Sequence, residues 1–140
     1  MDERQLAESA EHLEAEYMAS MFDLAAPAVR DGLGMEYERL GGGVATVMTH
    51  DPTGGDWSRV VGTGWSAPFD HEVVDRAVAL FLRHDLHRVM FQVSPLVEGR
   101  WEELLEAHGF VPDGAWVKFV RDLAPPPLVH TRDRKSTRLN

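Results

Sequence analysis

The 140-residue chain contains no cysteine. This absence excludes disulfide bonds, zinc sites built on thiolates and cysteine nucleophiles. A metal site would therefore depend on histidine and carboxylate side chains. His84 and His87 lie three residues apart, but they span a predicted helix end, and the sequence fixes no third ligand beside them. We expect no metal site.

The chain also lacks any apolar run near the ~18 residues that a bilayer-spanning helix needs. Its first residues, MDERQLAESAEHLEAE, are acidic and helical in pattern. A signal or transit peptide has the opposite character, because it begins with basic residues. We therefore expect no membrane partner and a cytoplasmic location.

Basic residues are scarce. The formal net charge is −9, and the last eight residues carry three basic side chains against one acidic, so the rest of the chain stands at −11. Nucleic-acid binding needs clustered Lys and Arg to displace counterions. The composition therefore makes nucleic acid an unsuitable partner.

Familiar catalytic motifs are missing as well. The sequence has no G-x-x-x-x-G-K phosphate loop and no serine in a G-x-S-x-G setting. The carboxylate pairs Glu14/Glu16 and Glu102/Glu103 fall in helical patterns, where we expect them on solvated faces. No catalytic residue is predicted.

What the sequence does contain is the composition of a folded domain, with 44% hydrophobic and 26% charged residues. Residues 1–34 are predicted to be a helical segment that Asp2 and Gln5 cap at its start. Six residues at helical spacing form a stripe that we expect to face the core: Leu6, Ala10, Leu13, Tyr17, Met21 and Leu24.

After this segment the pattern predicts a mixture of strands and helices. MEYERL and VATVMT form a hairpin around Gly41–Gly43, because triple glycine between two β-prone runs favours a tight turn. The following predicted elements are a strand at 58–63, a helix capped by Asp70, a strand at 88–93, a helix around Trp101 that stops at Gly109, and a strand in WVKFVRDL. This order predicts an α/β (α+β) fold, with a mixed, mostly antiparallel sheet flanked by helices.

One loop is a candidate cofactor site. VGTGWSAPF, from Val61 to Phe69, places two glycines between a strand and a helix. Backbone amides at such a helix start can hold a pyrophosphate, so Gly62, Gly64 and Ser66 are the candidate cofactor-binding residues. Trp65 and Pro68 crowd the same loop, and a proline offers no N–H donor.

The segment from Gly42 to Leu123 resembles a GNAT N-acetyltransferase domain. WEELLEAHGFVPDGAWVKFVRDL, with its Gly109-Phe110 pair, is similar to the helix, Gly-Phe and returning strand that end such domains. The order of three antiparallel strands, helix, strand, helix and strand also matches. The resemblance implies a GNAT-like domain at 35–123 and acetyl-CoA as the cofactor of the whole protein.

The chain departs from the family at two places. The resemblance implies an Arg/Gln-x-x-Gly-x-Gly/Ala run between the fourth strand of the family and its next helix, where this chain has VGTGWSAPFD. It also implies a tyrosine, the general acid, four residues before Gly109, where this chain has Leu105. Leucine has no proton to donate.

These departures favour a degenerate N-terminal copy from a tandem-domain acetyltransferase. Residues 124–132 would begin a Pro-rich linker to the partner, a C-terminal GNAT domain that binds acetyl-CoA. The chain alone is then expected to be inactive. Two alternatives stay open: a divergent single-domain acetyltransferase that binds acetyl-CoA at Val61–Phe69, and a non-enzymatic binding module that uses its four tryptophans.

The ending, DRKSTRLN at 133–140, differs from the rest because it is basic and has no apolar pattern. It can be encoded by GATCGGAAGAGCACACGTCTGAAC, which resembles the start of a widely used short-read sequencing adapter. We interpret these eight residues as an artefact and expect the natural reading frame to continue elsewhere.

Overall fold

The structure is a computed structural model, and it describes residues 1–118. Most of the predicted last strand, the linker at 124–132 and the tail at 133–140 lie outside the described residues. Residues 116–118, which are described, are not part of a strand. Within the described part, no helix combines the length and apolar character that crossing a membrane requires.

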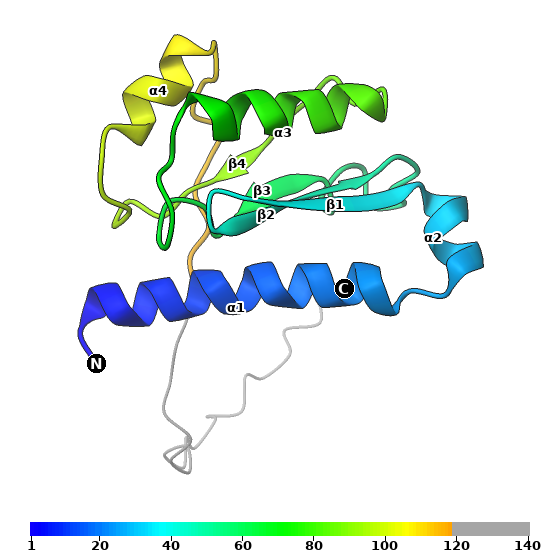
Figure 1. The fold of residues 1–140 in the computed structure, drawn as a ribbon, viewed down its shortest axis with the longest axis horizontal. Coiled ribbons are helices and arrows are strands. Elements are labelled where there is room, and N and C mark those ends of the chain that lie inside the picture. Colours follow the sequence, from blue (N-terminus) through cyan, green and yellow to red (C-terminus); the bar gives the residue numbers. More distant parts are fainter. Residues whose placement is uncertain (119–140) are drawn as a thin grey trace, which may run out of the picture.

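Four helices and one four-stranded sheet make up the fold (Figure 1). Strands β1, β2 and β3 run antiparallel in that order, and β4 pairs with β3 in parallel. The predicted α+β class, with its mixed, mostly antiparallel sheet and N-terminal helix, is confirmed. The elements are α1 (Glu3–Leu24), α2 (Pro27–Leu33), β1 (Met35–Leu40), β2 (Gly43–Met48), β3 (Arg59–Val61), α3 (His71–Arg83), β4 (Phe91–Gln92) and α4 (Trp101–Ala107).

Local sequence signals set several of these elements. Gly41 and Gly42 have φ angles of 59° and 80°, as the two central positions of a hairpin turn of the primed type require. At the start of α1, Asp2 and Gln5 form the predicted capping box. The carboxylate of Asp70 accepts the N–H of Val73 at the start of α3. The predicted hairpin and both helix caps are confirmed.

Two strands are shorter than predicted. β3 covers Arg59–Val61 instead of 58–63, because Gly62 turns the chain with a φ of 72°. β4 covers only Phe91–Gln92 instead of 88–93. Its ladder with β3 has two registered pairs, Val60 with Phe91 and Val61 with Gln92. A short neighbour therefore limits the length of β4.

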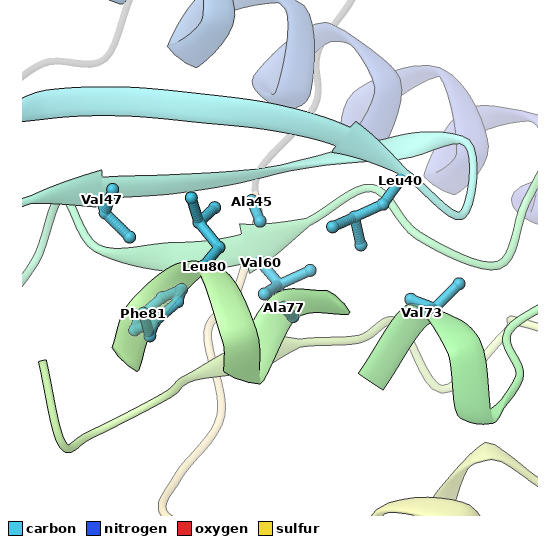
Figure 2. Packing of buried hydrophobic residues seen from close by; sticks show 8 residues of the cluster. All are labelled: Leu40, Ala45, Val47, Val60, Val73, Ala77, Leu80 and Phe81. Atoms are coloured by element: carbon cyan, nitrogen blue, oxygen red, sulfur yellow. The ribbon is translucent and has the colours of Figure 1, made fainter. Parts of the chain in front are cut away.

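The sheet is packed on both faces, with α1 on one side and α3 on the other (Figure 1). On the α3 side the side chains of both layers interlock, as Figure 2 shows. On the α1 side Ala15, Met18 and Ala19 pack against Val44 and Val61. The α3-side cluster comprises Leu40, Ala45, Val47, Val60, Val73, Ala77, Leu80 and Phe81.

The predicted facing of α1 is wrong. Its buried residues are Glu11, Ala15, Met18, Ala19 and Phe22, whereas Leu6, Leu13, Tyr17 and Leu24 of the predicted stripe are exposed. The reason is the close approach of the helix to the sheet: a Cβ atom on Gly62 would lie 2.9 Å from the Cβ of Ala15. Only small side chains fit at such a contact, so the alanine-rich face turns inward.

The close contact of β2 with the backbone at the end of β3 gives a stability prediction. A Cβ on Gly43 would lie 2.1 Å from the carbonyl oxygen of Val61, and backbone atoms there cannot move aside cheaply. Gly43→Ala should therefore lower the free energy of unfolding by about 3 kcal/mol, measured by urea denaturation. Gly32 in α2 has no atom within 4 Å of its added Cβ. Gly32→Ala should raise stability by about 0.5–1 kcal/mol; equal effects of the two substitutions would contradict the packing described here.

Candidate functional site

The predicted cofactor loop joins the end of β3 to the start of α3. Gly62 and Gly64 have φ angles of 72° and 86°, which glycine adopts without strain. Ser66 lies exposed two residues further on. The structure thus places Gly62, Gly64 and Ser66 in one loop at the N-terminus of α3.

Contacts within the chain account for the glycines of this loop. Gly62 lies under Ala15, as described above. A Cβ on Gly64 would lie 2.6 Å from Cγ1 of Val97, which is itself buried. Ser66 fills the space beside the hairpin turn, because a Cβ on Gly42 would lie 2.4 Å from its Oγ. Close packing therefore accounts for the glycines at positions 42, 62 and 64 without any ligand.

The backbone donors and charges of the loop also bear on anion binding. The N–H of Gly64 donates to the carbonyl oxygen of Gly41 at 2.8 Å, and the N–H of Val73 donates to Asp70 at 3.1 Å. Glu72 adds a second carboxylate in the first turn of α3. Two negative groups at a helix N-terminus already satisfy its dipole. A pyrophosphate there would meet like charge, and the N–H groups of Gly64 and Val73 are already committed.

Two polar atoms of the loop remain unsatisfied. Thr63 Oγ1 and Trp65 Nε1 are buried and have no hydrogen-bond partner within the described part of the chain. The guanidinium of Arg4 lies 5.2 Å from the centre of the Trp65 ring. That guanidinium is already engaged by the carbonyl oxygen of Leu96 and the carboxylate of Glu98. Leaving a buried polar atom without a hydrogen-bond partner costs about 1–3 kcal/mol. A ligand that bonded to Thr63 Oγ1 and Trp65 Nε1 would remove this cost.

A second group of polar residues lies between α1 and the sheet, and the sequence interpretation missed it. Glu14 forms an ion pair with Arg59 at 3.2 Å and accepts a hydrogen bond from Gln92 at 3.0 Å. Lys118 Nζ lies 2.5 Å from a carboxylate oxygen of both Glu11 and Glu14. The expectation that Glu14 lies on a solvated face is therefore wrong. Its signal was present, because Glu11 and Glu14 share helical spacing with the buried Ala15 and Met18.

The surrounding groups lower the pKa of Glu14. Burial pushes the pKa of Glu14 upward, but hydrogen bonds from Lys118 and Gln92 and the charges of Lys118 and Arg59 outweigh it. The pKa of Glu14 therefore lies below the ordinary value of 4.5. A carboxylate held in this way is a poor proton acceptor near neutral pH. The group joins α1 to β3, β4 and the segment before residue 119.

The histidines do not gather into a site. His84 contacts Glu36 at 2.6 Å, whereas His87 contacts Asp85 at 3.1 Å, so the two take separate partners. His71 and His108 lie 3.4 Å apart between α3 and α4. Within residues 1–118, no set of three or more His, Cys, Asp or Glu side chains is placed to hold a metal ion.

Two open hollows lie on the surface of the described chain. The residues that line them include neither the Glu14 group nor the glycines of the cofactor loop. The two hollows are therefore separate from both candidate sites. The first, of about 280 Å³, is lined by Pro95, Val97, Gly99, Arg100, Trp101, Glu102 and Glu103. The second, of about 250 Å³, is lined by Phe22, Asp23, Arg30, Met35, Glu36 and Tyr37.

No family model matches this chain, and neither the curated proteins nor the solved structures yield a match. Its function is therefore inferred from its own residues and their geometry.

The Glu14 group predicts a pH-dependent stability. Glu14→Gln leaves Arg59 without its charge partner, and that side chain is only 13% exposed, so unfolding free energy should fall by about 1–3 kcal/mol at neutral pH. Because the folded pKa of Glu14 is depressed, its contribution is present above pH 4.5 and is lost as the pH falls through the folded pKa. The gap between wild type and variant should therefore narrow below pH 4.5.

Urea denaturation at several pH values measures this gap. Glu102→Gln serves as the control, because Glu102 is exposed and its variant should stay within about 0.5 kcal/mol of wild type throughout. A Glu14→Gln gap that stays constant down to strongly acidic pH would show that Glu14 stabilises through shape and not through charge.

Proposed function

We propose that the chain is a cytoplasmic, non-catalytic, GNAT-like lobe of a longer N-acetyltransferase. In this proposal a second, C-terminal domain binds acetyl-CoA and transfers the acetyl group to an amine acceptor. The observation that carries the proposal is the state of the Gly62–Asp70 loop. The N–H of Gly64 is used by the chain itself, the glycines of the loop are explained by packing, and acidic groups occupy the start of α3.

The arrangement of elements supports the same proposal. Three antiparallel strands are followed by α3, by β4 in parallel with β3, and by α4, which is the order that the resemblance implies. The position where the resemblance implies a general acid holds Leu105 in α4. A leucine there leaves the departing thiolate without a proton donor.

A second candidate is a divergent acetyltransferase that binds acetyl-CoA at the Val61–Phe69 loop. The unsatisfied Thr63 Oγ1 and Trp65 Nε1 favour it, since both belong to that loop. In this case the cofactor would supply the missing hydrogen-bond partners.

Calorimetric titration of the full chain with acetyl-CoA separates the two candidates. We expect no binding at millimolar acetyl-CoA, because a phosphate would meet the carboxylates of Asp70 and Glu72, and the N–H of Gly64 is already bonded within the chain. Saturable binding would favour the second candidate. It should then weaken in Pro68→Glu, which adds a negative charge on an exposed loop residue, and not in Leu82→Glu, which adds the same charge on α3.

The proposed longer protein can be tested by sequencing the genomic locus. The natural reading frame should lack the codons for residues 133–140 and should continue after residue 132 into a segment with Arg/Gln-x-x-Gly-x-Gly/Ala. A locus that retains the codons for DRKSTRLN followed by a stop codon would contradict the proposal.

A further inference from the structure

The outward face of α1 carries an apolar row that the fold does not use. We name Leu6, Leu13, Tyr17 and Leu24 the outer stripe. Their exposed fractions are 37%, 71%, 58% and 85%. The helix thus has two apolar faces, and only the one with Ala15, Met18, Ala19 and Phe22 is buried. Exposed apolar residues scattered singly need no explanation, but a row along one helix indicates a binding surface.

The spacing of the outer stripe indicates what shape would bind there. Its members are separated by seven, four and seven residues, which are intervals of a coiled-coil seam. Side chains at this spacing form a straight row along one side of a helix. Figure 1 shows α1 as an outer layer, with the sheet and α3 on its other side, and no helix or strand of residues 1–118 covers the stripe. A second helix lying along α1 fits such a row.

Charge decides which helix would fit. Helix α1 carries six acidic side chains and one arginine. That arginine, Arg4, is engaged by Leu96 and Glu98 on the inner side. Glu3, Glu16 and Asp23 lie at positions beside the outer stripe. Arg39 already pairs with Glu16, and Asp23 accepts from the Tyr37 hydroxyl. Within residues 1–118, therefore, only Glu3 and Asp23 of the three lack a basic partner. Pairing with a second copy of α1 would bring acidic rows together, whereas a helix with basic flanks would be attracted.

We propose that the outer stripe of α1 binds an amphipathic helix whose apolar seam is flanked by Lys and Arg. Leu13 and Tyr17 form the centre of the contact, and Leu6 and Leu24 form its ends. The acidic side chains beside the stripe select the basic partner and set its alignment. This inference does not rest on the acetyltransferase proposal, since it uses neither the Gly62–Asp70 loop nor any cofactor.

The test uses the full chain and a labelled synthetic peptide of about three heptads, with Leu at the seam positions and Lys on both flanks. Repulsion between its lysines keeps this peptide from pairing with itself. Fluorescence anisotropy should show saturable binding by the wild-type chain. A peptide with Glu flanks should bind at least about tenfold more weakly, because its charges repel those of α1. A scrambled peptide of the original composition should also bind at least about tenfold more weakly, because it has no apolar seam.

Matched variants separate seam binding from simple charge attraction. Leu13→Glu and Leu82→Glu each add one negative charge at an exposed leucine, the first in the outer stripe and the second on α3. Leu13→Glu should weaken peptide binding at least about tenfold, although it makes the chain more acidic. Leu82→Glu should change it less than about twofold. Leu24→Glu, at the end of α1, provides a second stripe variant, and urea denaturation checks that each variant is folded.

Equal affinities of Leu13→Glu and Leu82→Glu would overturn the proposal, because binding would then follow net charge alone. A wild-type dimer in sedimentation velocity that Leu13→Glu dissolves would overturn it in favour of a second copy. Stripe-dependent binding to zwitterionic lipid vesicles, without binding to the basic peptide, would also overturn it. None of these outcomes alters the acetyl-CoA result, so the two proposals fail separately.

Discussion

The close approach of α1 to the sheet is the constraint on which the rest of the structure depends. Gly43 and Gly62 leave no room for a Cβ atom between β2, β3 and the helix, and Ala15 lies directly over the contact. A helix held this near must turn its small residues inward. As a result its leucines point away from the sheet. Glu11 becomes buried and Glu14 partly buried along the edge of the contact, where basic partners balance them.

The same constraint changes how the loop after β3 is interpreted. Glycines that let a backbone approach a phosphate and glycines that let one backbone approach another look identical in a sequence. Here Gly62 and Gly64 touch Ala15 and Val97, so packing alone explains why they are glycines. The carboxylates of Asp70 and Glu72 then make the start of α3 acidic. These features support the proposal of a non-catalytic lobe.

Local signals made much of the fold predictable from the sequence. The hairpin and the caps at Asp2 and Asp70 follow from turn glycines and side-chain acceptors. The facing of α1 was not predictable in this way, because Leu13 and Met18 give it an apolar row on each side. Glu14 was misplaced for the same reason. Strand lengths depended on pairing partners, which no single segment contains. For the loop, sequence brought Gly62, Gly64 and Ser66 together correctly but could not show that Val97 and Gly41 occupy it.

The contact of Lys118 with Glu11 joins residues 107 positions apart, and Arg4 reaches Leu96 across 92 positions. These distances have a kinetic meaning, since contacts between remote parts of a chain form late and slow the folding of a domain. During synthesis α1 leaves the ribosome before the other described elements, and the strands and side chains that fix it follow much later. Among the described elements, α1 therefore spends the longest time with both apolar faces uncovered. A binding helix on its outer stripe would shorten that exposure on one side only.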